Sequence, residues 1–167
     1  MNRNISGLIA YIIAFFLQYF LGGLLPNHWS DPNLILCMTA VLTYVYEDSL
    51  IWMAYGCLFA FLADLAGGMW IGIGVLSIVI TELLVLLFRY IFNNENMPNA
   101  VIFSLAATLV YDSLYWIIAR ICGSPYSYLY MLKDLPAALI INVIIMMVLW
   151  AVMIRKVTPH KRDRYIG

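Results

Sequence analysis

The chain has 167 residues and no net charge, and its composition is 65% hydrophobic but only 11% charged. About a quarter of the residues are charged in an average soluble domain, so this chain lacks the polar surface that such a domain needs. The composition excludes a disordered protein and a nucleic-acid binder built on a basic patch. A mean hydropathy of +0.91 predicts a protein whose main solvent is lipid.

Apolar stretches follow one another along the whole chain and predict an all-α integral membrane protein, a compact bundle of six transmembrane helices. The stretch 33–46 is the shortest. A helix of this length rises only about 21 Å, which is less than the apolar core of a membrane, about 30 Å. A re-entrant hairpin would suit it, but we expect a full crossing that Asp31-Pro32 and Glu47-Asp48 extend. The pieces left over are too short for a soluble module, so we expect one membrane domain over 1–167. The expected spans are 8–25, 33–46, 50–66, 70–92, 98–122 and 135–154.

Short polar segments separate these spans and carry the expected helix starts. Asp31 precedes Pro32 and Asp134 shortly precedes Pro136, which are the positions of N-caps before a first helical turn. The segment 123–134 is accordingly expected to be an outer loop.

The basic residues predict the orientation of the chain, because cytoplasmic loops are enriched in Lys and Arg. With six spans both termini share one side of the membrane, and that side carries seven of the nine basic residues. Only Arg120 and Lys133 fall on the other side. We therefore expect both termini to be cytoplasmic.

Polar residues inside the spans are informative, because each is costly in lipid. One interpretation is a polar cavity around Glu82 and Asp112 that binds a solute or passes protons. The other, which we favour, is interhelical hydrogen bonding that holds this bundle or a partner helix in register. The helical spacing also places Arg89 on the Glu82 face and aligns Asp112, Trp116 and Arg120 in one stripe. The intramembrane polar residues are Glu82, Arg89, Asp112, Arg120 and Asn142.

The junction 63–74 is the most distinctive stretch, since four glycines follow Asp64 within ten residues. Gly67 and Gly68 allow a sharp turn, and the spacing of Gly68 and Gly72 allows close helix approach. The Asp64 carboxylate is placed to accept backbone N–H groups from the turn or from the start of the fourth helix. We interpret the stretch as a tight structural hairpin, with a solute-binding nest as the weaker alternative. Its residues are Asp64, Gly67, Gly68, Gly72 and Gly74.

No catalytic residues, metal site or cofactor are expected from the sequence. His28 and His160 fall on opposite sides of the membrane and cannot share a metal. No P-loop, G-x-S-x-G or H-E-x-x-H motif is present. For a membrane enzyme that acts on lipid, Asp64 with His28 is the single pair that can be built, and it is a weak alternative.

The order of these features resembles the family of the rod shape-determining protein MreD, from about Pro26 to Ile154. The resemblance rests on the loop that ends at 31–36, on Tyr44 in the short helix, and on the segment 55–65 with Asp64. The glycine-rich continuation of that family matches Gly68, Gly72 and Gly74. The chain departs from the family pattern at Ala60, where members often have glycine, and at 69–71, where members often have a proline.

The resemblance implies a non-catalytic scaffold of the bacterial cell-elongation (rod) complex in the plasma membrane. MreD-like proteins associate with the single-span protein MreC, and through it connect MreB filaments to RodA and a class B penicillin-binding protein. Beyond these partners we expect contact with the lipid bilayer and none with nucleic acid.

The MreD family is thought to share its fold with the substrate-binding subunits of energy-coupling-factor transporters. A solute-binding subunit of a vitamin transporter is therefore the alternative function. Ala10-x-x-x-Ala14 resembles the small-residue contact that such subunits make with their membrane partner.

Overall fold

The computed structural model describes residues 3–24, 32–67, 70–92 and 97–162, and within them it contains helices and no strand. Every helix except α2 is long and apolar enough to cross a membrane. The prediction of an all-helical chain with several helices that could span a membrane is therefore confirmed for the described residues. The helices are α1 (Arg3–Leu24), α2 (Leu34–Val45), α3 (Ser49–Gly67), α4 (Ile73–Ile91), α5 (Met97–Ile121) and α6 (Tyr128–Arg162).

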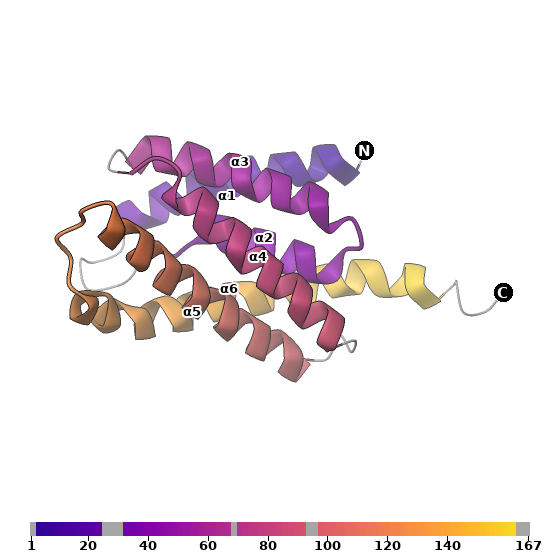
Figure 1. Ribbon diagram of the computed structural model, residues 1–167. Helices are drawn as coiled ribbons and strands as arrows, with labels where there is room; N and C mark the ends of the chain where they lie inside the picture. The colour runs from indigo at the N-terminus through magenta and orange to yellow at the C-terminus, as the bar shows by residue number, and fades with distance from the viewer. Residues whose placement is uncertain (1–2, 25–31, 68–69, 93–96, 163–167) are drawn as a thin grey trace.

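Successive helices run in alternating directions through the bundle (Figure 1). The start of α1 and the end of α6 therefore lie at the same end, which we call the terminal end. The ends of α1, α3 and α5 and the starts of α2, α4 and α6 lie at the opposite end. We call it the distal end.

Helix α2 occupies the centre of the bundle. All of its residues are buried, and it packs against each of the other five helices. A helix that is apolar on every side finds a suitable environment in such a position, because no face has to meet solvent. The short apolar segment is thus the core around which the longer helices assemble.

The expected extension of this helix is wrong at its C-terminal end. Helix α2 stops at Val45, and the next residue, Tyr46, has an extended backbone with φ −96° and ψ 146°. Residues 47–48 therefore lie outside the helix, which rises only about 18 Å by itself. Asp31 lies outside the described residues, and the N-cap is Asn33, which sequence inspection overlooked.

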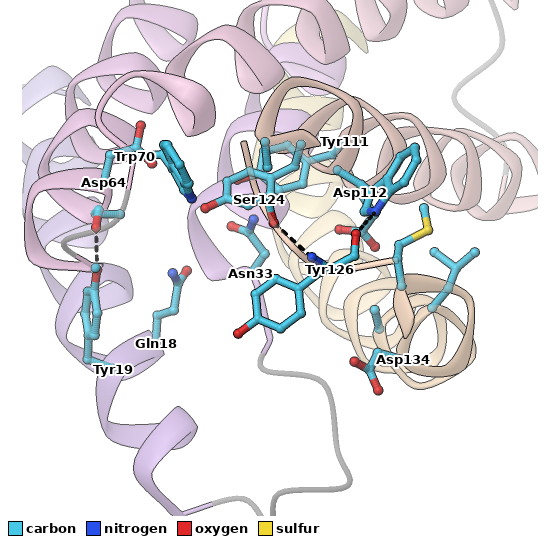
Figure 2. Close-up of a pocket in the computed structure, with 18 residues that line it drawn as sticks. Gln18, Tyr19, Asn33, Asp64, Trp70, Tyr111, Asp112, Ser124, Tyr126 and Asp134 are labelled. Atoms are coloured by element: carbon cyan, nitrogen blue, oxygen red, sulfur yellow. Dashed lines mark hydrogen bonds between the residues drawn. The ribbon is translucent and has the colours of Figure 1, made fainter. Parts of the chain in front are cut away.

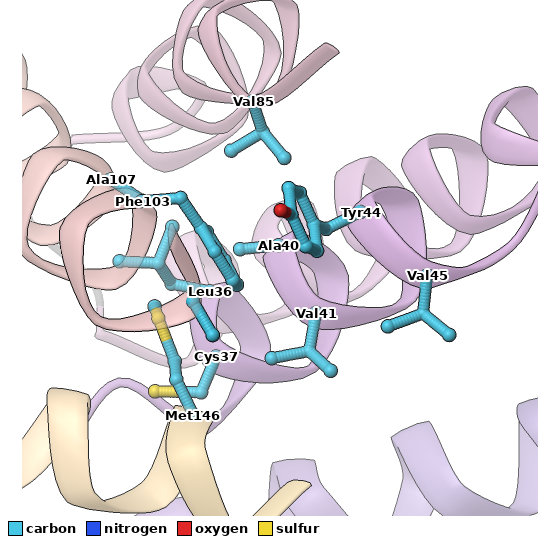
Figure 3. Close-up of a cluster of buried hydrophobic side chains, with 11 residues drawn as sticks. Leu36, Cys37, Ala40, Val41, Tyr44, Val45, Val85, Phe103, Ala107 and Met146 are labelled. Atoms are coloured by element: carbon cyan, nitrogen blue, oxygen red, sulfur yellow. The ribbon is translucent and has the colours of Figure 1, made fainter. Parts of the chain in front are cut away.

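Two clusters of buried side chains flank α2. In the first, residues of α2 meet residues of α4, α5 and α6, and the rings of Tyr44 and Phe103 stack at a centroid distance of 4.3 Å (Figure 3). In the second, α2 meets α1 through Tyr11, α3 through Trp52 and α4 through Ile78. Because α2 contributes to both clusters, it joins the two halves of the bundle.

Helix α6 is longer than the span 135–154 expected from the sequence, since it begins at Tyr128 and continues to Arg162. Most of the expected loop 123–134 is therefore helical. Asp134 lies in the second turn and is no N-cap, and Pro136 lies inside the helix. The polar residues at 133–134 indicated a loop, but a helix that projects beyond the apolar core of the membrane accommodates such residues.

Candidate functional site

The C-terminal end of α2 is held by Arg89 of α4. The last carbonyl groups of a helix have no partner within it, and they carry partial negative charge. Nη1 of Arg89 donates hydrogen bonds to the carbonyl oxygens of Thr43, at 3.1 Å, and of Tyr46. Arg89 therefore satisfies and neutralises the end of α2, which is a structural role.

The N-terminal end of α2 is held by side chains from three segments. Oδ1 of Asn33 accepts a hydrogen bond from the backbone N–H of Leu36 at 3.0 Å. Oδ1 of Asn142, on α6, accepts one from the N–H of Asn33 at 3.0 Å, and Oε1 of Gln18, on α1, accepts one from Ile35 at 3.3 Å. For Asn142, as for Arg89, the geometry favours interhelical hydrogen bonding over a solute cavity.

The junction between α3 and α4 is organised by Asp64. Its Oδ2 accepts hydrogen bonds from the backbone N–H groups of Gly72 and Gly74, both at 2.9 Å, and Oδ1 lies 3.2 Å from the Gly74 nitrogen. The hydrogen bonds expected between Asp64 and the start of the fourth helix are therefore present. They join the last turns of α3 to the first turn of α4.

The glycines of this junction have different roles. Gly72 has a φ of +97°, a left-handed conformation that disfavours other residues, and an added Cβ at Gly74 would lie 2.5 Å from Oδ1 of Asp64. Gly67 ends α3, and an added Cβ there or at Gly72 would meet nothing within 4 Å. The turn and the close approach expected of Gly68 lie outside the described residues.

A pocket of about 590 Å³ opens at the distal end (Figure 2). Its walls come from the last turns of α1, α3 and α5, from the first turns of α6, and from the segments before α2 and α4. No Cα atom of α1 comes within 8 Å of one of α6 among the described residues, and both helices contribute to the lining of the pocket. The aromatic residues in its lining are Tyr19, Trp70, Tyr111, Tyr115, Trp116 and Tyr126, and the polar ones are Gln18, Asn33, Asp64, Asp112, Ser124 and Asp134.

The predicted stripe on α5 is divided between this pocket and its edge. Asp112 and Trp116 line the pocket, and Nε1 of Trp116 donates to the backbone carbonyl of Tyr126 at 3.2 Å. Arg120 does not line it. Nη1 of Arg120 instead donates to the carbonyl of Ser124 at 2.8 Å and so fastens the connection between α5 and α6.

Glu82 does not belong to the pocket. It lies on α4 with no exposed surface, and neither of its carboxylate oxygens has a hydrogen-bond partner among the described residues. The Thr43 hydroxyl lies near this carboxylate, and the Ser77 hydroxyl is also buried without a hydrogen-bond partner among the described residues. The structure thus places Glu82 in the core and Asp112 in the pocket, and Glu82 is not among the described residues that line this pocket.

Sequence inspection identified the α5 side of the pocket but missed Gln18, Tyr19, Asn33 and Trp70. Gln18 is a polar residue within an apolar stretch, and Asn33 directly precedes one, so each carried a recognisable signal. Of the pair considered for an enzyme, His28 lies outside the described residues, and Asp64 is bound to backbone N–H groups. The described residues also contain no group of three His, Cys, Asp or Glu that could hold a metal ion.

No family model matches the chain, and no curated protein or solved structure is significantly similar to it. Function therefore has to be inferred from the residues, their geometry and the resemblance described above.

Proposed function

We propose that this protein is a non-catalytic scaffold of the bacterial cell-elongation complex, in the manner of MreD. The supporting observation is the α3–α4 junction. The segment with the most specific resemblance is also the one in which Asp64 binds the backbone N–H groups of Gly72 and Gly74. A junction fixed in this way holds two membrane helices in one geometry, which a docking surface for other membrane proteins requires.

In this role the protein lies in the plasma membrane with both termini in the cytoplasm. An MreC-like single-span protein is its direct partner, and MreB, RodA and a class B penicillin-binding protein are reached through that partner. The polar side chains that hold α2 contribute to a rigid bundle, and no reaction is assigned to them.

The proposal is tested by depletion and co-purification in the bacterium that encodes the chain. Depletion is expected to abolish rod shape, and the tagged protein is expected to co-purify with an MreC-like protein. Gly67→Ala should restore shape, because its Cβ meets nothing, whereas Asp64→Ala should not, because the junction loses its acceptor. Normal shape after depletion, without such a partner, would contradict the proposal.

A second candidate is the solute-binding subunit of an energy-coupling-factor transporter, and the distal pocket is the observation that favours it. One argument for this candidate is weakened, because Ala14 is buried in the core of the protein itself and Ala10 packs against the same cluster. Native mass spectrometry of the purified protein tests it. A bound molecule of vitamin size would favour it, and an empty protein would count against it.

A further inference from the structure

The distal pocket combines negative charge with aromatic surface. Three carboxylates line it, and no Lys, Arg or His is among the described residues of its lining. We propose that this pocket binds an organic cation, a molecule with an ammonium-type head and an apolar body. The inference rests on the pocket that favours the second candidate function, and it does not depend on the scaffold role.

The carboxylates differ in what they can offer a ligand. Asp64 already accepts two backbone N–H groups. Asp112 on α5 is half-buried, and within the described part of the chain no donor is hydrogen-bonded to its carboxylate. A half-buried carboxylate without a partner is unfavourable, and a cationic ligand would supply that partner. Asp134 faces the same pocket from α6.

Aromatic rings supply the second requirement of a cation site, since the face of an indole or phenol ring attracts an ammonium group. Trp116 is the best placed of them, one helical turn after Asp112. Its ring is fixed by the hydrogen bond to the Tyr126 carbonyl and by an edge contact with Tyr128, at a centroid distance of 5.0 Å. A ring held in place before binding loses little freedom when the ligand arrives.

The volume of the pocket indicates an organic ligand. About 590 Å³ lies within the range of small-molecule sites, whereas a bare inorganic cation would leave most of the space unfilled. An ammonium group of this kind can come from a free solute or from the headgroup of a membrane lipid. The two sources share one chemistry, and competition separates them.

The test uses calorimetry on the full chain in dodecyl maltoside. The probe is benzoylcholine, and the reference is 3,3-dimethylbutyl benzoate, in which carbon replaces the charged nitrogen. We expect the cation to bind at least about tenfold more tightly than its neutral counterpart, since the interaction with the carboxylates depends on charge. Equal affinities, or no binding of benzoylcholine at millimolar concentration, would overturn the inference without any variant.

Variants then locate the site. Asp112→Asn should weaken benzoylcholine binding about tenfold and leave the neutral ester unaffected, and Trp116→Leu should weaken it by about three- to thirtyfold. The matched control is Asp48→Asn, at the terminal end, where neither probe should change. An equal loss in Asp48→Asn, or full binding in Asp112→Asn and Trp116→Leu, would overturn the inference.

Added phosphatidylcholine identifies the source of the cation. If it competes with benzoylcholine, the natural ligand is a lipid headgroup, and if it does not, the ligand is a free solute. A neutral or anionic ligand in native mass spectra would overturn the inference and leave the transporter candidate standing. Co-purification with an MreC-like protein tests the scaffold separately.

Discussion

Helix α2 and the distal pocket both carry polar side chains within apolar helices, but they use them differently. Around α2, Arg89, Asn142 and Gln18 each end on a backbone group that the helix itself leaves unpaired. In the pocket, Asp112 faces open volume with no donor from the described residues. The number of polar residues in a span therefore does not distinguish a structural role from a binding role. The partners of their hydrogen bonds do distinguish the two roles.

Each region also contains one carboxylate that departs from this pattern. Asp64 lines the pocket but is satisfied by backbone N–H groups, and Glu82 lies in the core with neither carboxylate oxygen in a hydrogen bond of good geometry to a described residue. Substitutions at the Asp64 junction, at Glu82, at Arg89 and at Asp112 therefore test which polar side chains stabilise the bundle and which are available to a ligand.

The largest loss of stability is expected for Gly74→Ala. The new Cβ would lie 2.5 Å from Oδ1 of Asp64, so the carboxylate has to shift, and we expect it to lose its two backbone donors. Losing two charge-assisted hydrogen bonds at a packed junction should lower the free energy of unfolding by about 3–4 kcal/mol. Thermal or denaturant unfolding in detergent measures this loss.

Gly67→Ala is the matched control for Gly74→Ala, because an added Cβ there meets nothing within 4 Å. We expect its stability to stay close to that of the wild type. If both alanine variants were equally stable, the role of Asp64 in joining α3 to α4 would be refuted.

Arg89→Met should have the next largest effect, a loss of about 2–3 kcal/mol, since the carbonyls of Thr43 and Tyr46 lose a charged donor. Arg155→Met is its control, because Arg155 is exposed near the terminal end of α6. Unfolding experiments in the same detergent compare the two. An Arg155 variant as unstable as the Arg89 variant would show that charge in general, and not closure of α2, stabilises the bundle.

Glu82→Met is expected to change stability in the opposite direction. Both carboxylate oxygens are buried, and neither forms a hydrogen bond of good geometry with a described residue, so an apolar side chain of similar size removes a desolvation cost. The free energy of unfolding should rise by about 1–2 kcal/mol. A loss of stability would instead show that the carboxyl group has a partner in solution, such as a buried water.

Hydropathy predicted the helices because a bilayer requires every backbone group to be paired within its own segment, which makes apolar length a strong signal. It did not predict that α2 would be central. A helix that is apolar on all sides has no preferred face, so its neighbours follow only from tertiary packing. The same limit applies to Glu82 and Asp112, whose similar depth was visible in the sequence while their directions were not.

Part of the candidate site is formed by residues that are close in sequence, and this part was predictable. Asp112 and Trp116 are four residues apart on one helix, and Asp64 lies close in sequence to the glycines that it binds. The opposite wall was not predictable in this way. Tyr19 and Asp134 come from α1 and α6, which are distant in sequence, and Asp134 was expected in a loop.

Asp112→Asn is expected to have the smallest effect on stability, a change within about 0.5 kcal/mol, because the carboxylate has no partner among the described residues to lose. The same variant should lose most of its affinity for benzoylcholine. Unfolding and calorimetry on one preparation therefore give opposite answers at this position, whereas at Arg89 unfolding alone should respond. If Asp112→Asn destabilised the protein as much as Arg89→Met, the Asp112 carboxylate would stabilise the fold as Arg89 does. The contrast between α2 and the pocket would then disappear.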